Sequence, residues 1–278
     1  MNLSELVKIA SSEEKAEEFL RSKGILKTFE NCPFCKSESI GKVRRNFYKC
    51  YGCRREWSIR RGSILEGIKI PLSKFILAIK LFILEVPVNK AYKELGVSYN
   101  TAHKIYQRIR KAIYDFVSRE DEVLSGEVEA DESYFGGKRR GKRGRGAMDK
   151  IPVFGILERN GKVKVEIVED VSAETILRET IKKVKRGSII YTDQFRSYDG
   201  LVIYGFRHER IDKSVRFSNG RVYINGIEGF WSYAKERLLK FHGVSRENFV
   251  YYLKELEFRY NNRKNLEEVL YKCLGGIK

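Results

Sequence analysis

Glu127-Val-Glu-Ala-Asp-Glu-Ser-Tyr134 alternates in the manner of a β-strand, with one set of side chains on each face. Downstream, two apolar runs, residues 151–158 and 163–168, flank a turn at Asn160-Gly161. Asn-Gly between two such runs is typical of a β-hairpin. The sequence therefore predicts three successive strands, of which the second and third form a hairpin.

A helix and a fourth strand follow the hairpin. Ser172 is a suitable N-cap for a helix over residues 173–185, which Gly187 ends. The apolar run 188–193 predicts a strand that stops at an aspartate. Two further helices are expected, over residues 226–239 and 247–261. This order predicts an α+β or α/β fold in which a mixed sheet is flanked by helices.

Two aspartates and a glutamate stand out among the acidic residues. Asp131 lies on the first strand and Asp193 ends the fourth, so the two carboxylates can meet in space. Glu228 starts the next helix and shares a face with Lys235, because seven residues make nearly two helical turns. Carboxylates without a histidine cluster favour Mg²⁺ or Mn²⁺, and two such ions roughly 3.5–4 Å apart serve phosphoryl transfer. The alternative is that these residues only cap elements and form ion pairs.

Four of the five cysteines form two Cys-x-x-Cys knuckles, Cys32-Pro-Phe-Cys35 and Cys50-Tyr-Gly-Cys53. Two knuckles at this separation supply the four thiolates of a tetrahedral structural zinc site. Two disulfides or a redox pair are the alternative. Basic residues around the knuckles indicate that this zinc ribbon holds phosphates, although a ribbon that only packs on the next domain would have the same spacing. Cys273 has no partner motif.

A helix-turn-helix pattern follows the ribbon. Pro71 opens an apolar helical pattern that ends before Pro87, and a second helix is expected over residues 88–95. The turn Gly96-Val-Ser98 leads into a third helix over residues 100–117, whose start would enter the major groove. The candidate DNA-reading residues there are Tyr99, Asn100, Thr101, His103 and Lys104. A plain helical hairpin is the alternative.

Composition points to a polyanionic partner. Lys and Arg number 55 against 37 Asp and Glu, for a net charge of +18, and the hydrophobic fraction of 42% is ordinary for a folded chain. The most apolar run is too short and too charged to span a bilayer, and no secretory signal follows Met1. We therefore expect a cytoplasmic, nucleoid-associated prokaryotic protein that binds nucleic acid and has no membrane partner.

The charge is concentrated in two places. Residues 31–120 carry +12, and the glycine-rich loop 136–150 carries +6. A loop of this composition cannot pack a core, and we expect phosphate to order it. Its candidate DNA-binding residues are Lys138, Arg139, Arg140, Lys142, Arg143 and Arg145. The alternative is a solvated loop without a partner.

Taken together, these motifs resemble the insertion-sequence DDE transposases that have an N-terminal zinc ribbon, similar to the ISXO-type transposase domain. The resemblance covers most of the chain, from about Cys32 to Asn265. Besides the knuckles, the matching stretches are Trp57-Ser-Ile-Arg-Arg-Gly-Ser-Ile64, Val128-Glu-Ala-Asp-Glu-Ser-Tyr-Phe-Gly-Gly137, Tyr191-Thr-Asp193, Asn225-Gly-Ile-Glu-Gly-Phe-Trp-Ser-Tyr-Ala-Lys235 and Phe258-Arg-Tyr-Asn-Asn-Arg263.

The family implies an RNase H-like catalytic fold with an acidic triad that binds the two catalytic ions. The triad maps onto Asp131, Asp193 and Glu228, and the family's lysine that contacts DNA near the cleaved end maps onto Lys235. The implied chemistry is attack of water at the transposon end, followed by attack of the freed 3′-hydroxyl on target DNA. Asn225 is an alternative third ligand, because relatives sometimes carry Asn or His near this position. Glu132 flanks the site and is expected to support the ligands.

The implied organisation is an N-terminal helix over residues 1–28, a zinc ribbon over 29–62, a helix-turn-helix domain over 63–120 and the catalytic domain over 121–278. The expected function is that of a transposase with structural zinc and catalytic Mg²⁺ or Mn²⁺, acting on double-stranded DNA as a homodimer. The main alternative is a catalytically inactive descendant that binds DNA as a regulator. An RNase H-type nuclease acting on RNA–DNA hybrids is a third interpretation, which the two N-terminal DNA-binding modules disfavour.

Overall fold

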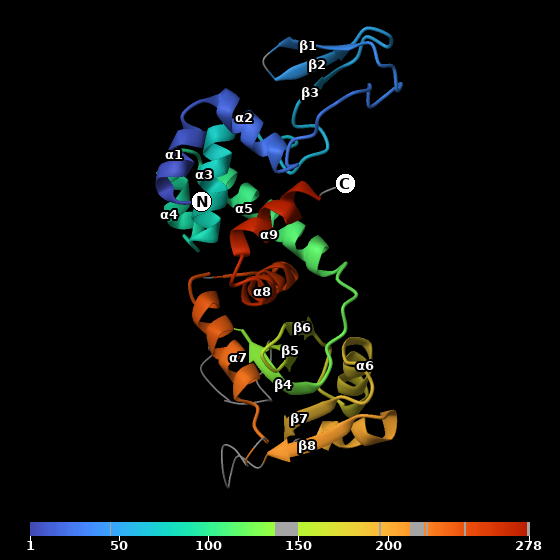
Figure 1. Ribbon diagram of the computed structural model, residues 1–278. Coiled ribbons are helices and arrows are strands. Elements are labelled where there is room, and N and C mark those ends of the chain that lie inside the picture. Colours follow the sequence, from blue (N-terminus) through green and yellow to red (C-terminus); the bar gives the residue numbers. More distant parts are fainter. Residues whose placement is uncertain are drawn as a thin grey trace. The chain divides into compact units, whose positions relative to one another are not determined.

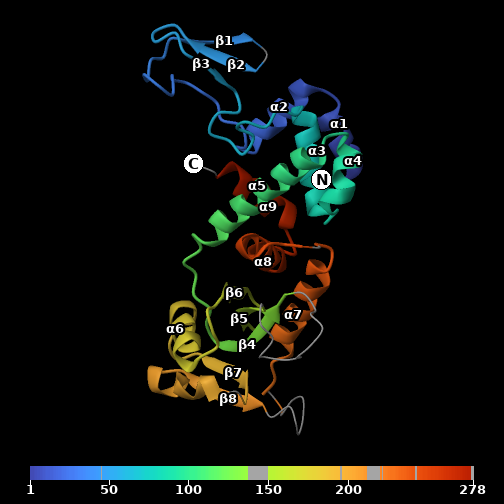
Figure 2. The same cartoon turned by 180° about the vertical axis from the view of Figure 1, so that it is seen from behind.

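The computed structural model describes residues 1–44, 46–136, 150–194, 196–211, 220, 222–241 and 243–276, with only the backbone at Arg196 and Asp199. The chain divides into two compact units, Met1–Phe116 with Lys264–Lys278 and Val117–Arg263. Figure 1 shows their elements in chain order, and Figure 2 shows them from behind. None of the described helices is both long and apolar enough to cross a membrane.

The first unit is mainly helical. Its helices are α1 (Leu3–Ala10), α2 (Glu13–Ser22), α3 (Leu72–Ile83), α4 (Val88–Leu95), α5 (Tyr99–Val117) and α9 (Leu266–Gly275). Ser12 caps α2 by accepting from the Lys15 amide. The Glu13 carboxylate accepts from the amides of Leu72 and Ser73 at the start of α3, where Pro71 offers no side-chain cap. This carboxylate fixes the entry of α3 against α2, because it satisfies amides that a helix start leaves unpaired.

A small antiparallel sheet completes the first unit. It contains β1 (Ile40–Arg44), β2 (Phe47–Cys50) and β3 (Glu56–Ser58) in that order. Trp57 is buried at its centre, stacked on Tyr48 with ring centroids 5.9 Å apart and edge-to-face with Phe29 at 5.7 Å. These few aromatic residues and two buried cysteines form almost the whole core of the segment.

The second unit is built on a five-stranded mixed sheet in the order β6-β5-β4-β7-β8. The strands are β4 (Glu127–Phe135), β5 (Ile151–Glu158), β6 (Val163–Ile167), β7 (Ile189–Asp193) and β8 (Arg207–Ile211). The pairs β4–β5 and β5–β6 are antiparallel, whereas β4–β7 and β7–β8 are parallel. The predicted mixed sheet with flanking helices is confirmed, and the arrangement agrees with the RNase H-like fold that the resemblance implies.

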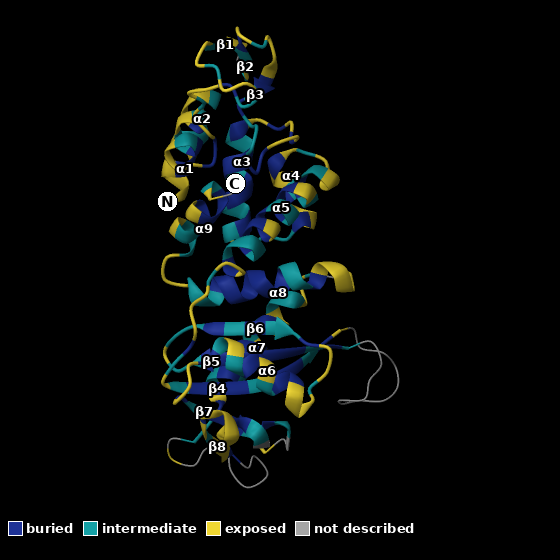
Figure 3. Ribbon diagram, turned by 90° about the vertical axis from the view of Figure 1, so that its right-hand side faces the viewer, coloured by how far each residue is buried: buried dark blue, intermediate teal, exposed yellow. Residues whose placement is uncertain are grey.

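Helices cover both faces of this sheet. One face packs on α6 (Ala173–Lys183) and the 3-10 segment η1 (Arg196–Tyr204), and the other packs on α7 (Asn225–Leu238) and α8 (Arg246–Asn261). Figure 3 shows the long central strand β4 mostly buried. Alternation along β4 divides its side chains: Val128 and Ala130 join the core under α6, whereas Phe135 joins the core under α7.

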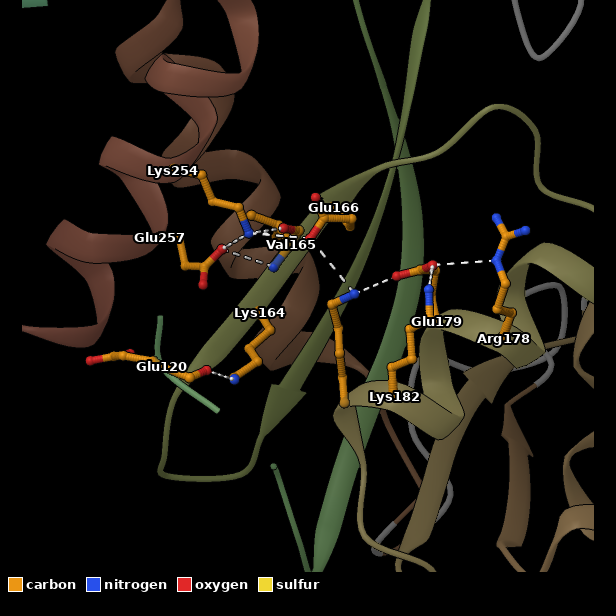
Figure 4. Close-up of polar contacts among 10 residues, drawn as sticks. Glu120, Lys164, Val165, Glu166, Arg178, Glu179, Lys182, Lys254 and Glu257 are labelled. Carbon is orange, nitrogen blue, oxygen red and sulfur yellow. Dashed lines mark hydrogen bonds and ion pairs between the residues drawn. The ribbon is translucent and has the colours of Figure 1, made fainter. Parts of the chain in front are cut away.

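The outer strand β6 is protected by side chains of α8. The Lys254 ammonium donates to the Val165 carbonyl at 2.6 Å, and the Glu257 carboxylate accepts from the Val165 amide at 3.1 Å (Figure 4). One turn further along α8, the Asn261 side chain accepts from the Val163 amide and donates to the Val163 carbonyl, both at 2.8 Å. Three side chains of one helix face thus replace the hydrogen bonds of a neighbouring strand and block edge-to-edge pairing.

We predict that Asn261→Ala lowers the free energy of unfolding by about 1–3 kcal/mol, because it leaves an amide and a carbonyl of β6 without partners. Asn262→Ala is the matched control, since the side chain of Asn262, the C-cap of α8, donates to the Phe258 carbonyl and, among the described residues, to no atom of β6. That control should change stability by less than about 0.5 kcal/mol. Urea unfolding followed by circular dichroism measures both, and equal effects of the two variants would contradict the edge-protection role.

Candidate active site and zinc ribbon

The parallel pairing of β4 with β7 sets the positions of the two predicted catalytic aspartates. The paired register is Glu127 with Ile189, Val128 with Ile190 and Glu129 with Tyr191. Continued by two residues, the same register brings Asp131 opposite Asp193. Phe135 on β4 and Tyr191 on β7 belong to the core under α7. Because Asp131 and Asp193 lie an even number of residues from them, strand alternation assigns both aspartates to the same face.

A third carboxylate joins the two aspartates. Oxygen atoms of Asp131, Glu132 and Asp193 all lie within 4.8 Å of one another. The ladder between β4 and β7 ends at Glu129, two residues before Asp131. Glu132 comes from the opposite face of β4 and is buried, with 8% of its surface exposed. The sequence singles out Glu132 only as a neighbour of Asp131, since strict alternation would separate the two.

Tyr198 holds the third carboxylate in place. Tyr198 belongs to η1 and is fully buried, and its phenol donates to Glu132 Oε2 at 3.0 Å. Burial raises the pKa of Tyr198 well above its usual range, and the negative charges of Glu132, Asp131 and Asp193 raise it further. The Tyr198 phenol therefore keeps its proton and donates a hydrogen bond to this negatively charged cluster. This partner was not predicted from the sequence.

Helix α7 lies along β4 beside this cluster. Gly155 pairs with Asp131 across the β4–β5 ladder, and a Cβ atom at position 155 would lie 2.5 Å from Trp231 Cζ2. Because Gly155 has no side chain, the indole of Trp231 can pack against the sheet at the position that faces Asp131. Trp231 and Phe230 are both buried, so they pack α7 into the core.

Glu228 lies one helical turn before Trp231 and is half-buried. Further along α7, the Lys235 ammonium lies 5.9 Å from the centre of the Phe135 ring, at the end of β4. Among the described residues, the cluster of oxygens within 4.8 Å does not include Glu228. The role of Glu228 as third ligand, and that of the exposed Asn225 as its alternative, stay predictions.

The acidic cluster suits a hard divalent cation. All of its donors are carboxylate oxygens, and it includes no histidine or cysteine. Such donors fit Mg²⁺ or Mn²⁺ better than zinc. Asp131, Asp193 and Glu132 are the described residues placed to hold such an ion.

The four knuckle cysteines also come together. Their sulfurs lie within 4.8 Å of one another, with Cys32 Sγ 3.7 Å from Cys53 Sγ and Cys35 Sγ 3.6 Å from Cys50 Sγ. Tetrahedral zinc with bonds of about 2.3 Å places neighbouring sulfurs roughly 3.8 Å apart, whereas a disulfide needs about 2.05 Å. All four are free thiols, so the donor set and its geometry fit zinc and not the disulfide alternative.

The backbone of each knuckle supports a bound metal. The Phe34 amide donates to Cys32 Sγ and the Cys53 amide donates to Cys50 Sγ, both at 3.4 Å. The bond from the Cys53 amide is the main cause that lowers the pKa of the Cys50 thiol to about 6, whereas burial and the neighbouring sulfurs raise the pKa of the Cys53 thiol to about 11. Cys50 therefore ionises more readily than Cys53. The residue after each knuckle, Lys36 or Arg54, has a positive φ that turns the chain away from the thiols.

The predicted DNA-reading residues lie at the start of α5. Gly96 ends α4 in a left-handed conformation with φ of 56°, and Ser98 begins α5 by accepting from the Thr101 amide. Ala102, Ile105 and Ile109 anchor the buried side of α5. The side chains of Tyr99, Asn100 and Lys104 are exposed, and those of Thr101 and His103 are half-buried. The predicted basic residues Lys138, Arg139, Arg140, Lys142, Arg143 and Arg145 lie outside the described residues.

We predict that the purified chain holds one zinc ion and that Cys50→Ala lowers its zinc affinity at least tenfold, because the site loses one of four thiolates. Cys273→Ala is the matched control, since Cys273 is a buried free thiol in α9 and has no knuckle partner. Elemental analysis and competition with a chromogenic chelator measure the zinc content and affinity. Full zinc binding by the Cys50 variant would contradict the four-thiolate site.

Comparison with known proteins identifies the family of the chain. The family model of the ISXO2-like transposase domain matches residues 123–261. A transposase-like protein of Haemophilus influenzae is 48% identical over 101 residues, which cover 36% of this chain and 82% of that protein. A protein of the transposable element ISH50 from Halobacterium salinarum is 29% identical over 253 residues, which cover 82% of this chain and 84% of that protein. The crystal structure of the Mos1 strand transfer complex aligns with a TM-score of 0.33 and 14% identity, over 73% of this chain and 74% of that one. The chain belongs to the family of insertion-sequence proteins with an ISXO2-like transposase domain.

Proposed function

We propose that this protein is an active transposase that cleaves DNA at the ends of an insertion sequence and joins them to target DNA in a metal-dependent reaction. The observation that carries the proposal is the meeting of Asp131 and Asp193, 62 residues apart in the chain, with Glu132 inside 4.8 Å. Three clustered carboxylates repel one another unless a cation neutralises them, so their gathering in a transposase-family chain supports a catalytic metal site.

Each residue has a distinct part in the proposed reaction. Asp131 and Asp193 hold the ions, and Glu228 completes the site from α7. Bound Mg²⁺ or Mn²⁺ would supply activation of the attacking oxygen and stabilisation of the leaving oxygen. Tyr198 keeps the Glu132 carboxylate oriented toward the aspartates. Lys235, exposed near the end of β4, contacts the DNA backbone close to the cleaved bond.

The first unit supplies DNA binding in this proposal. The exposed start of α5 reads base edges of the element end, while the basic ribbon contacts phosphates. Joining two element ends to one target requires two active sites or repeated use of one, so we propose a homodimer assembled on DNA. A DNA-binding regulator without catalysis would need only the first unit, and for such a protein the acidic cluster would have no role.

We predict that Asp193→Asn lowers cleavage and strand transfer at least about 100-fold in Mg²⁺, because it removes a charged ligand at the centre of the site. The measurement uses the full chain with double-stranded DNA that carries the native element ends, and gel electrophoresis resolves cleaved and joined products. DNA affinity should stay within threefold of wild type. Equal cleavage by the wild type and the variant, with intact binding, would favour the regulator.

The third ligand can be identified by comparing three variants in the same assay. We predict that Glu228→Gln reduces cleavage about as much as Asp193→Asn, whereas Asn225→Ala reduces it less than tenfold. Glu132→Gln keeps the shape of a buried side chain that Tyr198 contacts, so its effect on cleavage reports the charge of Glu132 alone. A larger loss in Asn225→Ala than in Glu228→Gln would assign the third position to Asn225.

A further inference from the structure

We propose that Glu129, together with Arg159, is a positioning residue that fixes the start of α7, and with it Glu228, relative to the two aspartates. The inference rests on the proposed function for the role of Glu228, but the placement of α7 can be tested without any activity. Glu129 is buried, with 1% of its surface exposed, and the reaction outlined above does not use it.

The Glu129 carboxylate contacts α7 directly. Its Oε2 accepts from the Ile227 amide at 2.9 Å, so it satisfies one of the amides that the first turn of a helix leaves unpaired. The negative charge also lies at the positive end of the helix dipole. A Cβ atom at position 226 would lie 2.8 Å from the same oxygen, so Gly226 allows the helix to approach this closely. The start of α7 therefore rests on Glu129.

Arg159, which follows β5, links the Glu129 carboxylate to the segment that enters α7. Its Nε donates to Glu129 Oε1 at 3.1 Å, and its Nη2 donates to the Tyr223 carbonyl at 2.8 Å, in the segment that enters α7. The centre of the guanidinium lies 3.7 Å from the Tyr191 ring centre and 3.9 Å from that of Tyr223. The guanidinium also donates to Glu127 Oε2, so it is held between two rings and three acceptors and has little freedom to move.

The contacts of the Glu129–Arg159 ion pair lie next to the predicted catalytic residues. Glu129 precedes Asp131 by two residues on β4, and Tyr191 precedes Asp193 by two residues on β7, where Glu129 and Tyr191 are paired in register. Ile227 immediately precedes Glu228 on α7. The contacts of the Glu129–Arg159 ion pair thus join the three elements that carry the proposed triad. On each element, the contact lies within two residues of the triad carboxylate.

The ionic character of the Glu129–Arg159 pair favours a role in positioning α7. A buried ion pair adds little stability compared with apolar residues of similar volume, because desolvation of the charges offsets their attraction. Its directional hydrogen bonds nevertheless define one position for the helix, which apolar packing alone would not. A displacement of about 1 Å at a reacting group lowers rates by roughly 100-fold, so such a device has a functional use.

The chain offers a reporter for this placement, because it has only two tryptophans, Trp57 in the ribbon and Trp231 on α7 over Gly155. In protein labelled with 5-fluorotryptophan, ¹⁹F NMR gives one resonance for each, and a Trp57→Phe variant assigns them. We expect Glu129→Gln to shift or broaden the Trp231 resonance and to leave the Trp57 resonance unchanged. Glu127→Gln is the matched control: Glu127 also accepts from Arg159, at 2.9 Å, but its side chain is 38% exposed and lies at the start of β4.

A second pair of variants tests the same placement without changing any charge. Gly226→Ala adds a methyl group against Glu129 Oε2, whereas at Gly229, in the same helix, an added Cβ meets nothing within 4 Å. Alanine is a better helix former than glycine, so both variants should fold. We expect Gly226→Ala to move the Trp231 resonance and Gly229→Ala to leave it unchanged. This pair also keeps the test decisive if Glu129→Gln does not fold.

Activity then distinguishes placement from a purely structural role. We expect Glu129→Gln to lower kcat for cleavage at least tenfold, with the DNA Kd within twofold of wild type and all protein folded at the assay temperature. An unmoved Trp231 resonance in both Glu129→Gln and Gly226→Ala would overturn the proposal, as would equal losses of kcat in Glu129→Gln and Glu127→Gln. Wild-type protein without cleavage would refute the proposed function alone, because the resonances still report whether Glu129 places α7.

Discussion

The parallel pairing of β4 with β7 is the constraint on which the rest of the second unit depends. It is a non-local contact between strands separated by a hairpin and a helix, and it leaves Asp131 and Asp193 each two residues beyond the last paired residues, Glu129 and Tyr191. A slip of one residue would turn one of the aspartates to the opposite face of the sheet. The antiparallel partner β5 contributes Gly155 at the position facing Asp131, which admits Trp231 and brings α7 down beside the site. Strand register and one missing side chain thus position both the cluster and the helix.

A bound metal would contribute to folding in the ribbon but not in the second unit. In the ribbon, the four thiols surround a segment with almost no core beyond Trp57 and a few aromatic neighbours, so zinc would supply much of its stability. In the second unit, two apolar cores hold the sheet, and the carboxylates are gathered at the cost of mutual repulsion. A cation at the acidic cluster would relieve that repulsion without being needed for the fold.

Much of the fold follows from local signals in the sequence. Pro87, Gly96 and Ser98 delimit α4 and α5 to within one residue of the prediction, and Asn160-Gly161 marks the turn between β5 and β6. The strand β8 was not predicted, because four of its five residues are polar or charged and only Ile211 is buried at the sheet edge. Within the segment predicted as one N-terminal helix over residues 1–28, the structure has two helices, α1 and α2, and α9 was not predicted. Helices α1 and α9 are short, and packing against the rest of their unit stabilises them more than their own sequence does.

The candidate site could be predicted only in part. Motif spacing and family resemblance identify Asp131, Asp193 and the knuckle cysteines, which the structure brings together. Glu132 reaches the cluster from the other face of β4, which strict two-residue alternation cannot indicate. The contacts of Tyr198 and Arg159 depend on elements that are distant in sequence, so no local pattern reveals them.

The central claim is that Asp131 and Asp193 share a divalent cation, and anomalous scattering from crystals soaked in Mn²⁺ tests it most directly. We expect an anomalous peak between these two carboxylates in the wild-type protein and its loss in Asp193→Asn. A wild-type crystal with Mn²⁺ bound elsewhere, or with no peak at this pair at a saturating Mn²⁺ concentration, would contradict it.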